Sequence, residues 1–256
     1  MSFGICIVSA APVRQEPSHR VEMINQLLFG ETVEILDEKE EWLQVRHLFD
    51  GYTGWSTNHL IQSVGREVAE KNELYVSTGL LNPVTLPDEL INLCMGSSLT
   101  GYNEETRLLW DGQHKYHGTF RKVSDEPSEH LLLHTLQPWI NAPYLWGGRT
   151  FLGVDCSGFV QIIFKVMGFA LKRDAYQQAE QGEVVSNISL AKTGDVAFFN
   201  NEAGRITHVG IILHGNKVIH ASGKVRIDAV TEEGIINKEN GHKTHSLHSI
   251  KRMIYI

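Results

Sequence analysis

Residues 155–168 read DCSGFVQIIFKVMG, and this stretch decides how the C-terminal half of the chain is interpreted. Its apolar residues follow helical spacing and stop at Gly168, which predicts a buried helix that begins beside Cys156. A cysteine reacts as its thiolate, and a helix N-terminus stabilises negative charge through its dipole and N–H groups. The same groups can bind the oxyanion that forms on an attacked carbonyl. Cys156 is therefore a candidate nucleophile, although a buried structural cysteine would show the same pattern.

Two histidines downstream supply what a nucleophilic cysteine needs, a base and a partner that orients the base. His208 begins the apolar segment THVGIIL, and His220 lies within KVIHAS, and both segments read as β-strands. A lone histidine on an apolar strand is usually a core residue. Two of them on consecutive strands, after a cysteine at a helix start, favour a catalytic group of three residues.

The loop between these strands decides whether the two histidines can meet, because side chains alternate between the two faces of a strand. A three-residue loop over 214–216 pairs Leu213 with Lys217 and puts both histidines on one face. A two-residue turn would put them on opposite faces. Gly215 favours the three-residue loop, which we therefore predict.

Five segments in this order resemble the NlpC-type papain-like peptidase family: PYLWGG (143–148), DCSGFV (155–160), GDVAFF (194–199), THVGI (207–211) and VIHASG (218–223). The resemblance covers most of residues 125–256 and implies an α+β papain-like domain, in agreement with helices followed by strands. It implies that Cys156 is the nucleophile, His208 the general base and His220 the residue that orients His208. By the same resemblance Tyr144 lies beside the nucleophile, and Asp155 and Ser157 line the substrate pocket.

The first 64 residues have an all-β pattern of short alternating segments and tight turns, which favours a small barrel. A first strand is expected to end at Pro12. The segments VRQEPS (13–18), LLFGETVEIL (27–36), WLQVR (42–46) and DGYTGWSTNHL (50–60) resemble a bacterial SH3-like domain. The predicted domains are this barrel over 1–64, a second, degenerate SH3-like or β-rich domain over 65–123, and the peptidase domain over 124–256.

Composition narrows the class of protein. The chain has 256 residues and a formal net charge of −7, which argues against nucleic acid and an anionic membrane as partners. The three cysteines include no CxxC pair, and no cluster has the spacing of metal ligands, so neither a metal nor a cofactor is predicted. The odd cysteine count and the lack of a basic N-terminal region favour a cytoplasmic protein. A periplasmic or secreted protein without its signal peptide is the alternative, and the oligomeric state stays open.

Most of the thirteen histidines are interpreted as surface or core residues. His242, His245 and His248 are interpreted as part of a polar tail, and RMIYI (252–256) as the last strand.

Within the family the chain resembles the γ-D-glutamyl-L-diamino acid endopeptidases of the dipeptidyl-peptidase VI type. The resemblance lies in EPSHRVEM (16–23), QLLFGE (26–31) and RDAYQQ (173–178). It implies a barrel packed against the active site, where it recognises the free amine of an N-terminal L-alanine. The implied substrate is a liberated murein stem peptide, L-Ala-γ-D-Glu-diamino acid, cut before the diamino acid during cell-wall recycling.

A buried ammonium needs a charged, hydrogen-bonded partner. Asp174, Glu16 and the Tyr52 hydroxyl are the candidates for this role, with Glu22 competing with Glu16. Asp174 is otherwise a helix cap or a partner of Arg173, Glu16 a solvated charge and Tyr52 a surface aromatic residue. The family commonly has a serine where this chain has Ala175, so one hydrogen bond to the substrate is in doubt.

Two other functions fit the same sequence. One is a secreted peptidoglycan hydrolase whose barrels anchor it to the wall. The other is a wall-peptide-binding protein without catalytic activity, against which the presence of Cys156, His208 and His220 argues.

Overall fold

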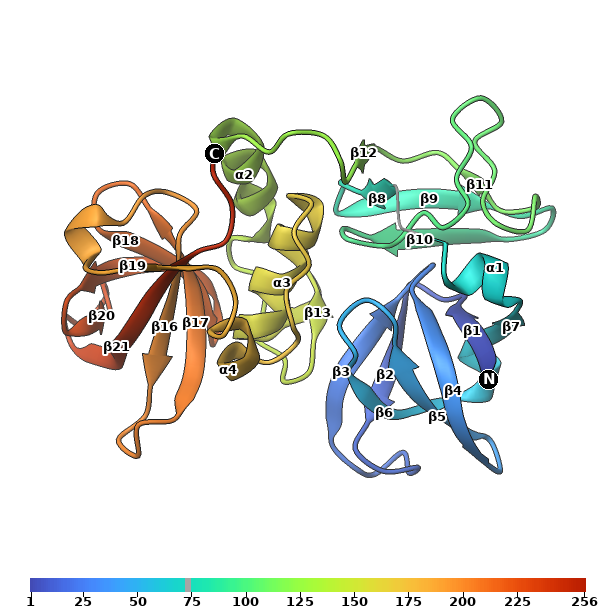
Figure 1. Cartoon of the computed structure of the whole chain (residues 1–256), viewed down its shortest axis with the longest axis horizontal. Helices are drawn as coiled ribbons and strands as arrows, with labels where there is room; N and C mark the ends of the chain where they lie inside the picture. Colours follow the sequence, from blue (N-terminus) through green and yellow to red (C-terminus); the bar gives the residue numbers. More distant parts are fainter. Residues whose placement is uncertain (72–74) are drawn as a thin grey trace. The chain divides into compact units, whose positions relative to one another are not determined.

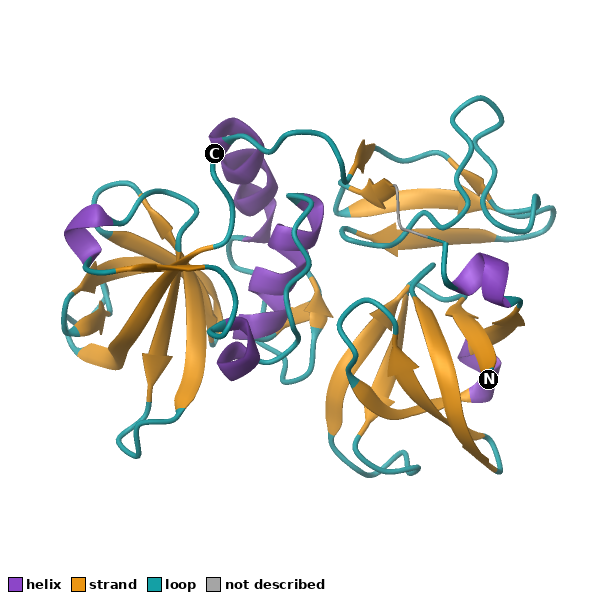
Figure 2. Ribbon diagram, viewed as in Figure 1, coloured by secondary structure: helices purple, strands orange, loops and turns teal. Residues whose placement is uncertain are grey.

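The structure, a computed structural model, describes residues 1–71 and 75–256. The chain forms two compact units, each described by itself below. Unit 1 contains residues 1–125 and 146–151, and unit 2 contains residues 126–145 and 152–256. Figure 2 shows that strands dominate both units and that the longer helices belong to unit 2.

The first 64 residues form an antiparallel seven-stranded sheet in the order β3-β2-β6-β5-β4-β1-β7 (Figure 1). Alternate residues of these short strands face a shared apolar core that includes Val13, Leu27, Val33 and Val45. The strands are β1 (Ser2–Cys6), β2 (Ala10–Arg14), β3 (Met23–Leu28), β4 (Thr32–Lys39), β5 (Trp42–His47), β6 (Thr53–Thr57) and β7 (Ile61–Val64), with the 3-10 turn η1 (Asn58–Leu60) and α1 (Arg66–Ala69). The prediction of an all-β N-terminal region is confirmed.

The prediction that Pro12 ends the first strand is wrong. β1 ends earlier, at Cys6, and Pro12 lies inside β2, where it pairs with Gln26 of β3. Proline has no N–H to donate to a sheet. The position tolerates it because β6, the other neighbour of β2, pairs only at Arg14.

The middle of the chain is also rich in sheet. Its strands are β8 (Tyr75–Ser77), β9 (Leu81–Thr85), β10 (Leu90–Cys94), β11 (Lys115–Tyr116) and β12 (Phe120–Lys122), in the orders β10-β9-β11 and β12-β8. A turn lies at Asp111-Gly112, with Gly112 at a φ of 69°. A core of Val84, Leu93, Leu99 and Tyr116 extends to Phe29, which follows β3. A separate SH3-like fold over 65–123, of which residues 72–74 lie outside the described part, stays a prediction.

One segment from later in the chain belongs to unit 1. Residues 146–151 include β13 (Arg149–Thr150), and the buried Arg149 guanidinium binds the buried Glu31 carboxylate with two hydrogen bonds of 2.7 and 2.9 Å. Glu31 also accepts the Leu28 N–H at 2.8 Å, and His47 Nε2 lies 3.4 Å from it. Proteins tolerate buried ions when the ions are paired and hydrogen-bonded, as Glu31 and Arg149 are.

Unit 2 combines helices with a second sheet in the order β15-β21-β16-β17-β18-β19-β20. β20 also pairs with β21, so six strands close into a barrel around Ala197, Phe199, Ile212 and Val218. The elements are α2 (Glu129–Leu136), η2 (Gln137–Trp139), β14 (Gly153–Val154), α3 (Cys156–Val166), α4 (Ala175–Gln178), β15 (Glu183–Val185), η3 (Ile188–Leu190), β16 (Val196–Asn200), β17 (Ile206–Leu213), β18 (Lys217–Ser222), β19 (Lys224–Thr231), β20 (Gly234–Ile236) and β21 (Lys243–Arg252). The buried helix α3 packs against β17 and β18 (Figure 1).

The prediction of a last strand over RMIYI is wrong, and so is that of a polar tail. The final strand is β21, which ends at Arg252 and contains His245 and His248. Few of its residues are apolar, so a hydrophobic pattern does not reveal it. It forms because its backbone pairs with β15, β16 and β20.

Candidate active site

Cys156 is the first residue of α3, where the sequence predicts a nucleophile. Asp155 caps the helix and accepts the Gly158 N–H at 2.7 Å. The Cys156 side chain is buried, and its sulfur is hydrogen-bonded by the N–H groups of Ser157 and of Val209 on β17. The start of α3 and the strand that carries His208 therefore lie together.

Asp155 and Ser157 both bind a buried arginine. Arg173 Nη2 lies 2.6 Å from Asp155 Oδ2, and Nη1 donates to Asp155 Oδ1 at 3.0 Å and to Ser157 Oγ at 2.9 Å. The guanidinium thus neutralises the carboxylate next to Cys156. The role of Asp155 and Ser157 in lining a substrate pocket stays a prediction, while these contacts give both side chains a structural role as well.

The two predicted histidines lie on one face of the sheet, because the loop between their strands has three residues. Leu213 pairs with Lys217, as predicted, and Gly215 and Asn216 adopt positive φ values of 74° and 54°. His208 Nε2 consequently lies 2.8 Å from His220 Nδ1. Both side chains are buried, and they form one hydrogen-bonded pair.

Three residues that the sequence did not reveal extend this pair. His220 Nε2 lies 3.0 Å from Asp228 Oδ2, and Arg226 binds the same carboxylate. The His245 ring stacks on the His208 ring, with centroids 4.1 Å apart and planes at 23°. The sequence could have indicated Asp228. A turn at Gly223 sets the register that pairs His220 with Arg226 and Val218 with Asp228, so Asp228 lies on the same face of the sheet as His220. His245 gave no comparable signal.

Burial decides the resting protonation states of the thiol and the imidazoles. It raises the pKa of Cys156 to about 12; the Asp155 charge raises it further, and the Val209 N–H and Arg173 oppose the rise. Burial also holds the pKa of His208 well below its ordinary value, helped by His245 and His220. The pKa of His220 falls to about 4 through burial, against the opposing effect of Asp228. A neutral thiol and neutral imidazoles therefore coexist at pH 7.

Tyr144 lies near the nucleophile, as the sequence predicts. Its N–H donates to Gly223 O at 3.0 Å, and it forms a parallel bridge with Val154, two residues before Cys156. Burial raises the pKa of the phenol, and the nearby charges of Cys156 and Asp155 add to the rise. The hydroxyl is therefore protonated and able to donate a hydrogen bond to a substrate oxygen.

The predicted amine-binding residues belong to different units. In unit 2, Asp174 is half-buried and caps α4, and its N–H donates to the Gln177 side chain at 3.2 Å in a capping box. Arg173 pairs with Asp155, so of the two alternative roles for Asp174 the structure shows the helix cap. Ala175 is buried and is the first residue of α4. In unit 1, the exposed Glu16 lies in the β2–β3 loop with Glu22, and the half-buried Tyr52 precedes β6.

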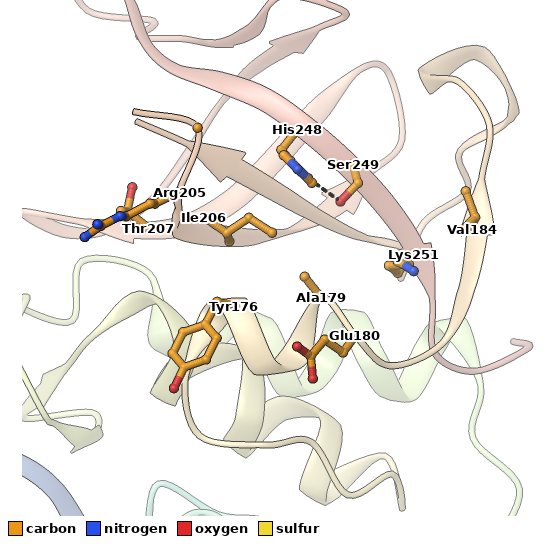
Figure 3. A pocket seen from close by; sticks show the side chains of 11 residues that line it. Tyr176, Ala179, Glu180, Val184, Arg205, Ile206, Thr207, His248, Ser249 and Lys251 are labelled. Carbon is orange, nitrogen blue, oxygen red and sulfur yellow. Dashed lines mark hydrogen bonds between the residues drawn. The ribbon is translucent and has the colours of Figure 1, made fainter. Parts of the chain in front are cut away.

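Unit 2 also has a pocket of about 720 Å³ beside α4, shown in Figure 3. Its lining includes Ile206 and Thr207 of β17 but neither His208 nor His220. Tyr176 and Glu180 lie on one side of it, and Arg205 on the other (Figure 3).

A cysteine at the start of a buried helix, beside a strand with a hydrogen-bonded histidine pair, is the arrangement of a papain-like cysteine peptidase. The comparisons with known proteins place the chain in that class. Residues 141–243 match the NlpC/P60 family, and residues 13–57 match the bacterial dipeptidyl-peptidase SH3 domain. The chain is thus a cysteine peptidase with an NlpC/P60 domain and a bacterial SH3 domain, and the predicted family and fold class are confirmed.

Several known proteins resemble most of the chain. A gamma-D-glutamyl-L-lysine dipeptidyl-peptidase of Bacillus cereus is 28% identical, over 86% of this chain and 74% of that protein. Dipeptidyl-peptidase 6 of Lysinibacillus sphaericus is 25% identical, over 90% and 92%. The crystal structure of an NlpC/P60 family protein from Bacillus cereus covers 99% of this chain and 100% of its own, with a TM-score of 0.82 and 22% identity, which establishes the shared fold.

Among the described residues, no helix has the length and apolar character that crossing a bilayer requires.

Proposed function

We propose that this peptidase hydrolyses the bond between γ-D-glutamate and the diamino acid in free murein stem peptides that begin with an unblocked L-alanine. The observation that carries the chemistry is the buried Cys156 at the start of α3, with its sulfur hydrogen-bonded to the N–H that follows His208. The similarity to dipeptidyl-peptidases over most of both chains supports the substrate class.

The reaction is an acyl transfer in two steps. The Cys156 proton passes to His208 while the sulfur attacks the amide carbonyl, and the imidazolium then protonates the departing amine. Water next attacks the thioester, again with His208 as the base, and releases the γ-D-glutamyl product. The protonated Tyr144 hydroxyl is suited to donate to the oxyanion that forms in both steps.

Recognition of the free N-terminal amine would limit the length of the substrate. An ammonium at the closed end of a cleft needs a carboxylate partner, and we assign this role to Asp174 or Glu16, with the Tyr52 hydroxyl as a further acceptor. A peptide still attached to muramic acid has no such amine. Such an enzyme acts on released fragments, which is a recycling role and fits a cytoplasmic location.

The test compares L-Ala-γ-D-Glu-diaminopimelate with its N-acetylated form and with intact sacculi. We expect cleavage of the free tripeptide, a loss of at least tenfold in kcat/KM for the acetylated peptide, and little release from sacculi. Cys156→Ala serves as the control for contaminating activity. Equal cleavage of both peptides would refute amine recognition, and preferred release from sacculi would favour a secreted wall hydrolase.

A further inference from the structure

Four buried or half-buried side chains of unit 2 form a chain of hydrogen bonds across three neighbouring strands. His208 Nε2 meets His220 Nδ1 at 2.8 Å, and His220 Nε2 meets Asp228 Oδ2 at 3.0 Å. Arg226 lies 2.8 Å from Asp228 Oδ2 through Nε and 3.0 Å from Oδ1 through Nη2. The register pairs Gly210 with His220 and His220 with Arg226, so the sheet itself aligns these groups on one face.

The Asp228 carboxyl is ionised and therefore only accepts hydrogen bonds. Burial would raise the pKa of this carboxyl, but the hydrogen bonds from Arg226, the Lys238 N–H at 3.0 Å and His220 hold the pKa below its ordinary value. An ionised carboxylate has no proton to donate. The 3.0 Å contact therefore requires the proton to reside on His220 Nε2.

The position of this proton fixes the positions of the other protons on the His220 and His208 rings. His220 is neutral at pH 7, so a proton on Nε2 leaves Nδ1 as an acceptor. The 2.8 Å contact then requires His208 to donate from its own Nε2. His208 is neutral as well, which leaves its Nδ1 with a lone pair. We infer that Asp228 is a positioning residue that fixes the tautomer of both histidines and so makes His208 Nδ1 the basic nitrogen of the site.

The inference deepens the proposed function and rests on it for its catalytic part. During attack the Cys156 S–H bond breaks and an Nδ1–H bond forms on His208, while the Nε2–H of His208 stays bonded to His220. The positive charge that develops on His208 is stabilised through His220 by the Asp228 carboxylate. The stacked His245 ring restricts rotation of the His208 ring and keeps Nδ1 directed to one side.

The discriminating variant is Asp228→Asn, which keeps the shape but can present an N–H to His220 Nε2. That N–H would move the His220 proton to Nδ1, and the His208 proton to Nδ1 in turn, which removes the lone pair. Nitrogen-15 NMR of the histidine rings in the substrate-free protein should show Nε2–H tautomers for both residues, and Nδ1–H tautomers in Asp228→Asn. We expect kcat on the free tripeptide to fall about 10³- to 10⁴-fold, as for a comparable Asp→Asn change in another triad, with KM changed less than about threefold.

Arg226→Gln is the matched control, because it removes the arginine but leaves Asp228 bonded to His220 and the Lys238 N–H. Its tautomers should stay Nε2–H, and its kcat should fall by less than about tenfold. Nε2–H tautomers in Asp228→Asn, or an unchanged kcat after the tautomers switch, would overturn the inference. The NMR result does not depend on turnover, so a failure of the proposed substrate would leave the tautomer assignment standing.

Discussion

Asp155 Oδ2 and Arg173 Nη2 lie 2.6 Å apart, immediately beside the sulfur of Cys156, and both side chains are almost fully buried. The pair places a negative charge next to the thiol that becomes negative in the proposed reaction. Arg173 offsets that charge and also holds Ser157, so the first turn of α3 depends on one guanidinium. Arg173, which comes from a later loop, therefore offsets part of the rise in the Cys156 pKa that burial and Asp155 cause.

Removal of that arginine should cost both stability and reactivity. Arg173→Met leaves Asp155 as an uncompensated buried charge, so we expect the free energy of unfolding to fall by about 3–5 kcal/mol, measured by urea denaturation. The double variant with Asp155→Asn should lose less than the sum of the single losses, because it no longer buries a lone charge. Arg205→Met, at an exposed arginine of the same unit, should change stability by less than about 0.5 kcal/mol. Additive losses would contradict the coupling.

Alkylation of Cys156 should accelerate with pH well into the alkaline range. Since burial raises the pKa of the thiol to about 12, the thiolate fraction grows about tenfold per pH unit from pH 6 to pH 10. Iodoacetamide labelling, followed on the Cys156 peptide by mass spectrometry, measures this rate. The same analysis separates it from labelling of Cys6 and Cys94, which are also buried. A plateau below pH 8 would instead indicate a resting thiolate–imidazolium pair.

Acid should destabilise the protein through the histidines of the barrel. His220 titrates near pH 4 when folded and near 6.5 when unfolded, so the unfolded state binds more protons in this window. The stability that neutral His220 contributes is present above about pH 6.5 and is lost as the pH falls to about 4, a change of about 3 kcal/mol. His208 acts with the same sign, and the facing groups are His245, Asp228 and Arg226.

Urea denaturation at pH 7.5, 6 and 5 tests this dependence. His220→Gln should flatten it, because the variant has no proton to gain at that position. His214→Gln, at an exposed histidine of the same hairpin, should keep the slope of the parent. A parent protein with equal stability at pH 7.5 and 5 would refute the prediction.

The buried Glu31–Arg149 pair should dominate the stability of unit 1. Glu31→Gln leaves Arg149 charged and buried, so we expect a loss of about 3 kcal/mol or more in the free energy of unfolding. Glu38→Gln, at an exposed glutamate of β4, should have almost no effect. Tryptophan fluorescence during urea denaturation would follow the transition through Trp42 and Trp55. Equal effects of the two substitutions would show that burial of the pair is unimportant.

The sequence alone predicted those parts of the site that local patterns encode. The apolar run after Cys156 predicted α3, and the length of the Gly215 loop predicted the shared face of His208 and His220. It did not predict β21, whose pairing with three strands replaces a hydrophobic pattern. His245 was missed for the same reason, since the pairing of β21 with β16, the neighbour of β17, brings it near His208. Arg173 was missed as the partner of Asp155 because Arg173 and Asp174 are adjacent in the sequence, which suggested an ion pair between those two residues instead.

The placement of residues 146–151 has a consequence for how such a protein can change its architecture. The polypeptide leaves unit 2 at Leu145 and returns to it at Leu152, and in between it supplies the countercharge of Glu31. A protein cut at residue 125 would separate that countercharge from its partner and leave the buried Glu31 carboxylate without its arginine. Loss or exchange of the N-terminal unit during evolution would therefore require a second, coordinated change in the short segment that contains Arg149.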